Sequence, residues 1–309
     1  MGAGAPPPPD PGAASPAPLP RGPAPERPVA VVRWPAVAGQ PVPADDVVAA
    51  EEPLQVSLDG EPFAVVMRTP GHDLELVLGL LYVEGLLATA GEVAAASVAA
   101  SGLIDAAPSG AQLPFPVRAL PEAENLVEIR LVRPLDRDRV GWQRNLVAST
   151  ACGICGAAAL DALRDDLRPL PPGPSFPAAS LRALEPALQE AQTTFRRTGG
   201  LHAAALFERS GRLLVVREDV GRHNAVDKLV GRALLRAELP LRDQGLLVSG
   251  RTSFELAHKA VAAGLPLLAA VSAPSSMAVH VAHTFGLTLV GFLRQGRFNV
   301  YAGAERIRA

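Results

Sequence analysis

Both cysteines of this 309-residue chain lie within the eleven residues from Leu146 to Gly156. Cys152 and Cys155 are three positions apart, and each is followed by a glycine. At the start of a helix such a thiol pair ionises readily, because the helix N-terminus favours the thiolate. Four uses fit the motif: an inert buried pair, half of a zinc site, a dithiol redox centre, or a sulfur carrier that holds a persulfide. The motif alone leaves all four open.

His202 invites comparison with the zinc deaminases, in which a His-x-Glu motif precedes the cysteine pair. Here the residue two positions after His202 is Ala204, and the cysteine pair comes first. The catalytic carboxylate is therefore missing, and the sequence argues against zinc deamination. A structural zinc would need two further ligands from distant parts of the chain, so we expect no permanently bound metal. His202 fits an ordinary hydrogen-bonded strand residue equally well.

Three loops each follow a predicted strand, open a predicted helix and carry small or cationic side chains. In α/β folds, loops at the carboxyl ends of strands collect ligands, and a helix N-terminus attracts anions. Three such loops in succession predict a phosphate-bearing ligand. Solvated loops with ordinary helix caps are the alternative. The candidate binding residues in these loops are Arg222, His223, Ser249, Arg251 and Ser275.

A fourth segment, near the C-terminus, mixes guanidinium groups with aromatic rings. Arginine can bind a phosphate through two hydrogen bonds, and an aromatic ring can stack on a base. The formal net charge of the chain is only −2, which favours a discrete nucleotide over a nucleic acid as the ligand. An ordinary edge strand is the alternative here. The candidate residues are Phe292, Leu293, Arg294, Gln295, Gly296 and Arg297.

The composition predicts a cytoplasmic protein with an ordinary hydrophobic core. Two cysteines and no signal-peptide pattern indicate a reducing compartment. The most apolar stretch, 74–90, is interrupted by glutamates and glycines, so it predicts a buried helix rather than a membrane span. Residues 1–28 are almost entirely Ala, Pro and Gly with scattered charges, and we expect a disordered extension there.

Sequence patterns divide the remainder into a small α+β domain over 29–145 and an α/β domain over 146–309. In the first domain we expect strands at 29–34, 54–58, 62–68 and 126–132, and a helix at 73–84 with Asp73 as its N-cap. In the second we expect helices at 157–166, 180–197 and 224–237 and a hairpin of 201–208 with 213–217. Strands at 246–249, 267–272 and 287–293 then alternate with helices that end at Gly264 and Gly286, the first opened by a capping box from Thr252 to Glu255. This alternation predicts parallel strand pairing.

Taken together, seven segments resemble the formate dehydrogenase accessory sulfurtransferases, the FdhD family. They span about 30–303, and the long loop motifs are far more specific than the cysteine pair. The segments are Glu51-Glu-Pro-Leu54, Met67-Arg-Thr-Pro-Gly-His-Asp73, Ala151-Cys-Gly-Ile-Cys-Gly156, Thr198-Gly-Gly-Leu-His202, Glu218-Asp-Val-Gly-Arg-His-Asn-Ala-Val-Asp-Lys228, Ser249-Gly-Arg-Thr-Ser253 and Gly291 to Tyr301.

The resemblance implies a fold and a function. The fold would be a small N-terminal α+β domain plus a three-layer C-terminal domain of cytidine-deaminase-like architecture. The function would be to take sulfur from a cysteine desulfurase and pass it to the molybdenum bis-guanine-dinucleotide cofactor, which formate dehydrogenase needs in sulfurated form. Cys152 would carry the persulfide with Cys155 assisting, and the stretch 292–297 would hold a guanine-dinucleotide portion of the cofactor. A homodimer is also implied.

Two rival functions stay open from the sequence. A dithiol–disulfide oxidoreductase would use the same two cysteines as a reversible disulfide. A non-catalytic chaperone would bind the molybdenum cofactor and use the cysteines only structurally. The first rival predicts a defined reduction potential, and the second predicts full maturation of formate dehydrogenase by a double cysteine variant.

Overall fold

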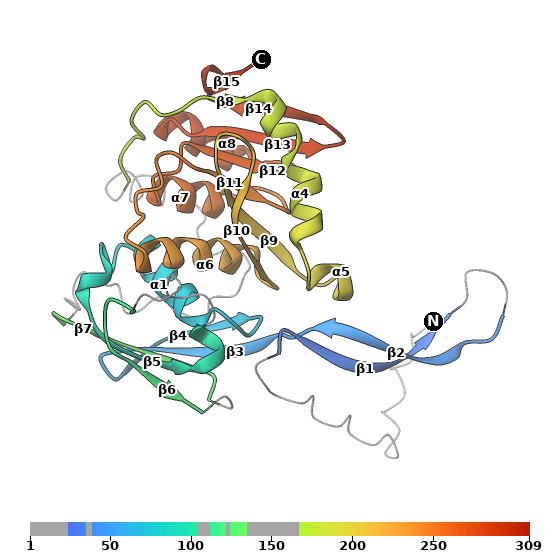
Figure 1. Cartoon of the computed structure of the whole chain (residues 1–309), viewed down its shortest axis with the longest axis vertical. Coiled ribbons are helices and arrows are strands. Elements are labelled where there is room, and N and C mark those ends of the chain that lie inside the picture. Colours follow the sequence, from blue (N-terminus) through green and yellow to red (C-terminus); the bar gives the residue numbers. More distant parts are fainter. Residues whose placement is uncertain (1–23, 35–38, 104–111, 122–123, 135–166) are drawn as a thin grey trace, which may run out of the picture.

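The computed structural model describes residues 24–34, 39–103, 112–121, 124–134 and 167–309. The cysteine segment, the predicted helix at 157–166 and the predicted domain boundary near 145 lie outside these residues. Two larger sheets with their helices form the body of the molecule, and a two-stranded arm extends from it (Figure 1).

The first larger sheet has five strands in the order β4-β3-β7-β5-β6. The predicted hairpin turn is confirmed at its edge, because Asp59 and Gly60 have φ values of 51° and 84°. Both values lie in the left-handed region that a tight two-residue hairpin turn requires. The sequence also misses part of this sheet, since the Ala-rich stretch near 95–120 holds β5 and β6. The elements are β3 (Glu52–Leu58), β4 (Glu61–Arg68), η1 (Ala90–Glu92), β5 (Val93–Ala99), η2 (Ala100–Leu103), β6 (Val117–Leu120) and β7 (Leu126–Leu131).

Helix α1 (Asp73–Val83) packs its leucines against this sheet. Nearly all of its side chains are buried, as its uniformly apolar sequence predicts. The prediction of Asp73 as N-cap is wrong, because His72 occupies that position with φ 59°. The Asp73 carboxylate is drawn instead to Arg68, whose Nε and Nη2 donate to it at 3.0 and 2.9 Å. Gly85 follows the end of the helix with φ 71°, as expected.

The second larger sheet has six strands in the order β10-β9-β11-β12-β13-β14. The predicted parallel pairing of the three strands β11, β12 and β13 is confirmed. Helices α6, α7 and α8 cover one face of the sheet, and α3 and α4 cover the other (Figure 1). The elements are β9 (His202–Phe207), β10 (Leu213–Asp219), α6 (Arg222–Leu235), β11 (Gly245–Val248), α7 (Phe254–Ala262), β12 (Leu267–Ala270), α8 (Ser276–Phe285), β13 (Thr288–Arg294) and β14 (Arg297–Ala302).

The predicted single helix over 180–197 is wrong, because the segment forms three short helices. They are α3 (Ala178–Arg182), α4 (Leu184–Ala191) and α5 (Phe195–Thr198). Pro186 cannot donate to the carbonyl four residues earlier, and its ring would clash with that carbonyl in a continuous helix. The chain therefore breaks at Ala183, and Pro186 lies in the first turn of α4, where a missing N–H does little harm.

Two helices join the parts of the molecule that carry the two larger sheets. Helices α1 and α6 pack closely through Gly79 and Gly231. A Cβ added at Gly231 would lie 1.8 Å from the carbonyl oxygen of Glu75, so only glycine allows the two backbones to approach this far. Beside this crossing, the buried Glu75 carboxylate accepts from Arg217 Nε and Nη2 at 2.6 and 2.9 Å. Burial raises the pKa of Glu75, although the bonds from Arg217 act in the opposite direction.

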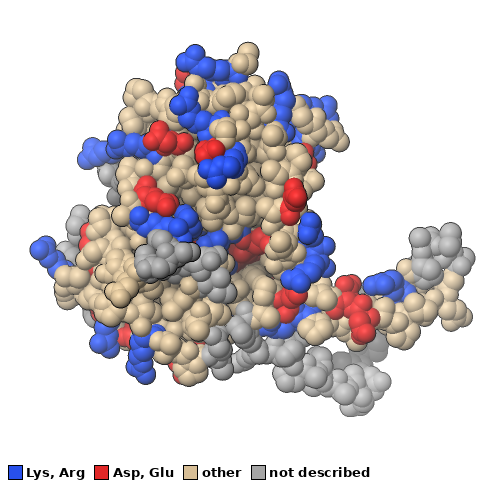
Figure 2. Space-filling view, viewed as in Figure 1, with Lys and Arg blue, Asp and Glu red and all other residues tan. Residues whose placement is uncertain are grey.

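A separate two-stranded arm precedes the first larger sheet. Strands β1 (Glu26–Arg33) and β2 (Val42–Ala49) pair antiparallel and extend away from the body (Figure 1). The strand expected at 29–34 is thus present, but it begins earlier, so the predicted disordered extension to residue 28 is too long. Near the C-terminus, β15 (Ile307–Arg308) follows η3 (Ala304–Arg306) and pairs parallel with β8 (Phe176–Pro177). Figure 2 shows acidic and basic side chains interspersed on the face drawn.

Candidate functional site

The predicted ligand loops meet at one edge of the six-stranded sheet. Strands β11, β12 and β13 are parallel, so the segments that follow them lie at the same edge. Backbone bonds tie these segments together: Ser272 N donates to Gly250 O at 3.3 Å, and Phe292 N donates to Ser272 O at 3.0 Å. The antiparallel strand β9 brings its first residue, His202, to this edge opposite Asp219 of β10.

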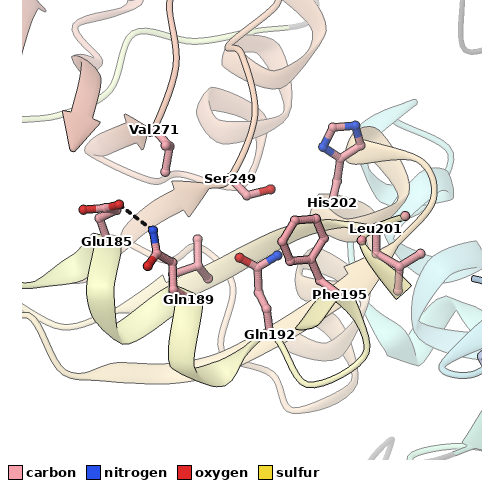
Figure 3. A pocket seen from close by; sticks show the side chains of 11 residues that line it. Glu185, Gln189, Gln192, Phe195, Leu201, His202, Ser249 and Val271 are labelled. Atoms are coloured by element: carbon pink, nitrogen blue, oxygen red, sulfur yellow. Dashed lines mark hydrogen bonds between the residues drawn. The ribbon is translucent and has the colours of Figure 1, made fainter. Parts of the chain in front are cut away.

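A hollow of about 410 Å³ opens at this edge beside α4 and α5 (Figure 3). Ser249 and Val271 form its sheet side, and residues of α4 and α5 form the opposite wall. The residues that line it are Glu185, Leu188, Gln189, Gln192, Phe195, Gly199, Gly200, Leu201, His202, Ser249 and Val271.

A second hollow, of about 250 Å³, lies at the N-terminus of α6. Arg222 and His223 of that helix line it together with His202, so His202 borders both hollows. The pKa of His202 is lowered, first by burial and then by the nearby charges of Arg222 and His223. His202 is therefore a neutral imidazole at pH 7. The lining residues are Glu51, Met67, His202, Val220, Gly221, Arg222 and His223.

Several polar residues of the segment 218–228 turn inward and hold the loop in place. Asp219 is fully buried, and its carboxylate accepts from Lys228 Nζ at 2.7 Å, Gly221 N at 2.8 Å and Asn224 Nδ2 at 2.8 Å. Lys228 Nζ also donates to the carbonyl of Thr69 at 3.1 Å. The loop that presents Arg222 and His223 is thus fixed to the segment between β4 and α1.

Two further contacts of this segment position neighbouring elements. Glu218 accepts from the backbone N–H groups of Thr194 and Phe195 at 3.0 and 2.8 Å, which fixes α5 beside the larger hollow. Asp227 is buried and pairs with Lys259 of α7 at 2.6 Å. Burial raises the pKa of Asp227, against the effect of the Lys259 charge. These residues serve the scaffold rather than the ligand.

His223 has partners on α7 as well as a place in the smaller hollow. Its Nε2 lies 2.7 Å from Glu255 Oε2 and 3.1 Å from Ser253 Oγ. The hydrogen bond with His223 lowers the pKa of Glu255. The predicted capping box from Thr252 to Glu255 is therefore wrong: the N-cap of α7 is Ser253, and the Glu255 carboxylate binds His223 instead of capping the helix.

Of the residues predicted in the next two loops, the two serines bind backbone N–H groups and the arginine is open to solvent. Ser249 lines the larger hollow, but its Oγ accepts from Ala203 N at 2.9 Å. Ser275 is the N-cap of α8, and its Oγ accepts from Ala278 N at 3.2 Å. Arg251 is exposed to solvent. Arg251 and Ser275 are thus both open to solvent, and both serine hydroxyls already accept a backbone hydrogen bond.

The predicted segment 292–297 forms the turn of the β13–β14 hairpin at the same edge. Phe292, Gln295 and Gly296 all have positive φ, which bends the chain sharply. The guanidinium of Arg294 lies 5.5 Å from the ring centroid of Phe292, and Arg297 is exposed nearby. Leu293 points into the core and is 1% exposed. Gln295 N donates to Glu185 Oε2 at 3.2 Å, which joins this turn to the wall of the larger hollow.

Within the described part of the chain, no group of three or more His, Cys, Asp and Glu could hold a metal ion. No helix among those residues is long and apolar enough to cross a membrane. Cys152 and Cys155 lie outside the described residues.

The family model described as FdhD/NarQ family matches residues 49–308. The chain belongs to the FdhD/NarQ family. Several similar proteins are each named "Sulfur carrier protein FdhD". The one from Streptomyces avermitilis is 47% identical and covers 91% of this chain and 94% of its own. The one from Mycobacterium tuberculosis is 44% identical with 87% and 95% covered, and the one from Sulfurisphaera tokodaii is 41% identical with 85% and 92% covered.

A solved structure extends the FdhD/NarQ assignment to the fold. The crystal structure of a protein from Desulfotalea psychrophila, described as a formate dehydrogenase accessory protein, matches with a TM-score of 0.65 at 23% identity. The match covers 92% of this chain and 98% of that one. The mixed α/β fold predicted from the sequence is thus confirmed.

Some residues of this FdhD/NarQ site carry no strong sequence signal. The sequence draws attention to His202 but assigns it no role, whereas the structure places it between the two hollows. The sequence misses Glu185, Gln189 and Gln192. The predicted single helix over 180–197 gave no indication that these three side chains face the same hollow. Their spacing of four and three residues, from α4 to its C-cap Gln192, is the signal that would have found them.

Proposed function

We propose that the chain carries sulfur from a cysteine desulfurase to the molybdenum bis-guanine-dinucleotide cofactor needed by formate dehydrogenase. The names of the related FdhD proteins support a sulfur-carrying role. The description of the Desulfotalea protein supports the link to formate dehydrogenase. The cofactor is the substrate of this reaction and not a resident group of the protein.

The observation that carries the proposal is the convergence of cationic loops beside two hollows at one sheet edge. Arg222 and His223 border one hollow, Ser249 borders the other, and the turn with Phe292 and Arg294 adjoins them. A cofactor with two dinucleotide arms needs several anchoring points for phosphates and bases. Arginine and a helix N-terminus bind phosphates, and concave sites of about 300–1,000 Å³ suit small organic ligands.

In the proposed reaction, the Cys152 thiolate attacks the outer sulfur of the desulfurase persulfide. The new S–S bond forms as the old one breaks, and the desulfurase cysteine leaves as a thiolate. Cys152 then holds the transferred sulfur as its own persulfide. In the second transfer this S–S bond breaks, Cys152 leaves as a thiolate, and the outer sulfur becomes a sulfide ligand of the substrate's molybdenum, whose reduced form supplies the two electrons. Cys155 assists, either as a second acceptor or by stabilising the charged form of its neighbour.

Mass measurement tests the sulfur step directly. The full chain would be incubated with a cysteine desulfurase and cysteine and then weighed intact. We expect a gain of sulfur mass that reducing agent removes, and no gain in the double variant Cys152→Ala with Cys155→Ala. An undiminished gain in the double variant would overturn the role of the cysteines. A fully active double variant in formate dehydrogenase maturation would favour the non-catalytic chaperone.

Three finer features belong to the same proposal. We propose a cytidine-deaminase-like arrangement for the C-terminal part, supported by a sheet covered with helices on both faces. We also propose a homodimer acting in the cytoplasm, without permanently bound metal. Light scattering of the purified protein would measure its mass in solution, and elemental analysis would measure zinc. A monomer, or zinc at one atom per chain, would contradict these features.

A further inference from the structure

Arg222 is a partly buried cation for which the described part of the chain supplies no counter-ion. It lines the smaller hollow, and its Nε is shielded from solvent. None of the described residues accepts a hydrogen bond from this Nε or pairs with the Arg222 guanidinium. The buried guanidinium of Arg217, by contrast, donates twice to the carboxylate of Glu75. A desolvated guanidinium without an anion is costly, so its position indicates that a ligand supplies the negative charge.

His202 brings a second polar side chain to the same hollow. No described residue forms a hydrogen bond with its imidazole. A Cβ at Gly250 would lie 3.4 Å from His202 Nδ1, so the ring lies close against the loop that follows β11. The positive charges of Arg222 and His223 oppose protonation of this imidazole and lower its pKa, after the larger effect of burial. A neutral imidazole still has one N–H to donate. Arg222 and His202 can therefore donate to one ligand in surroundings that favour an anion.

The start of α6 adds to the positive character of the hollow. Gly221 is the N-cap and offers no side chain to the free N–H groups of the first turn. That turn contains no acidic residue, although acidic side chains are favoured there. Its first two residues are instead the basic Arg222 and His223, a position that the helix dipole disfavours for cations. A bound anion would offset this unfavourable arrangement.

The carboxylates around the hollow leave the charge of Arg222 uncompensated. Asp219 pairs with Lys228 Nζ at 2.7 Å, and Glu255 Oε2 lies 2.7 Å from His223 Nε2. Glu51 lines the hollow but is exposed, so solvent and salt screen its charge. Glu51 is therefore a weak opponent of anion binding.

We infer that the smaller hollow is a subsite of its own for a compact oxyanion, bound by Arg222 and His202. The inference rests on the proposed function and deepens it: the oxyanion is the oxygen-bearing molybdenum end of the cofactor. The volume of about 250 Å³ lies below the roughly 300–1,000 Å³ of sites for organic ligands, whereas the larger hollow of about 410 Å³ lies within that range. His202 borders both hollows, so a nucleotide arm in the larger hollow and a molybdenum centre in the smaller one would meet beside it.

Calorimetric titration of the full chain with molybdate tests this assignment. Molybdate is a compact oxyanion that carries the same metal and oxygen ligands without the organic part of the cofactor. We expect it to bind, and Arg222→Gln should weaken it by about tenfold or more, the effect of one charge-assisted hydrogen bond. His202→Leu should also weaken it. Glu51→Gln should strengthen it about twofold, because an exposed like charge is removed. Arg242→Gln, at an exposed arginine outside both hollows, should leave the affinity unchanged.

Two competitors separate the molybdenum end from a phosphate. Molybdate should bind equally well in the presence of saturating GDP, since the nucleotide takes the larger hollow. Inorganic phosphate should bind more weakly than molybdate. Displacement of molybdate by GDP, or tighter binding of phosphate, would assign the hollow to a phosphate group and overturn the inference.

The remaining outcomes distinguish this inference from the proposed function. No binding of molybdate, or binding that Arg222→Gln leaves unchanged, would overturn the subsite and leave the sulfur-carrier proposal to its own mass measurement. A chain that binds molybdate as expected but gains no sulfur would contradict the sulfur step and keep the subsite. Circular dichroism checks that each variant folds. If Arg222→Gln does not fold, the exposed Glu51→Gln decides, because unchanged or weaker binding there contradicts an anion in the hollow.

Discussion

Replacing Gly231 by alanine adds one methyl group where two helix backbones touch. In an ordinary helix interior, alanine is favoured over glycine by about 1 kcal/mol. At this crossing the added Cβ would lie 1.8 Å from Glu75 O, and a Cβ at Gly79 would lie 1.9 Å from Asp227 O. Relief can come only from movement of one backbone away from the other, since no flexible side chain lies between them.

The expected cost follows from this geometry. Ordinary contacts of a Cβ begin at 3.4 Å, so α1 and α6 would need to separate by about 1.5 Å. Overpacking a closely packed interior costs about 1–3 kcal/mol. Separation would also lengthen the hydrogen bonds between the adjacent buried side chains of Glu75 and Arg217. A buried ion pair that loses its hydrogen-bond geometry lowers the free energy of unfolding further. We expect the free energy of unfolding of Gly231→Ala to fall by about 3 kcal/mol or more.

Urea unfolding followed by far-ultraviolet circular dichroism measures this loss. Gly91→Ala is a matched control, because a Cβ there would meet only Thr89 Oγ1 at 3.6 Å. The control should unfold at the urea concentration of the unmodified chain. A Gly231→Ala protein as stable as the control would refute the argument that the two backbones are in direct contact.

Two other predictions concern charged groups. Asp219→Asn leaves Lys228 buried without its counter-ion, so the urea midpoint of this variant should fall by the equivalent of about 3 kcal/mol. Glu208→Gln removes a charge from the exposed pair with Arg212 and should not measurably change the urea midpoint. Equal effects of the two substitutions would contradict the buried-pair argument. The folded-state pKa of His202 lies below its ordinary value of 6.5, so His202 contributes stability above that pH and loses it as the pH falls through the folded pKa. Between about pH 7.5 and pH 5.5 the unmodified chain should lose more stability than His202→Gln, and equal slopes in urea unfolding would refute the shift.

The regular C-terminal elements could be predicted because local and global signals agree. Apolar runs at 246–249, 267–272 and 287–293 alternate with helices that end at glycines, and the structure keeps all of them. Errors arise where a partner outside the helix overrides a local capping signal. Asp73 and Glu255 both fit local capping patterns, but Arg68 and His223 bind their carboxylates instead.

The site could be predicted only in outline. Loops that follow parallel strands must share an edge of the sheet, so the bonding of Ser272 to both Gly250 and Phe292 follows from the sequence pattern. The inward orientation of Asp219 does not follow, because it depends on Thr69 from a distant segment. Hydrogen bonds to distant backbone groups likewise decide which serine hydroxyls remain free for a ligand. The bond from Ala203 N to Ser249 Oγ is an example, and it could not be predicted from the sequence.

The glycine crossing has a consequence for dividing this chain or combining it with relatives. The loop that carries Arg222 is fastened to Thr69, and α6 lies against α1 with no side chain between them. Residues after 167 alone would thus lose the Thr69 contacts of Asp219 and Lys228 and the surface of α1 that covers α6. A chimaera of two relatives would function only if both glycines and the Thr69 contacts came together. In this protein, α1, α6 and the loop that carries Arg222 must therefore come from the same parent, whereas neither sheet alone sets that requirement.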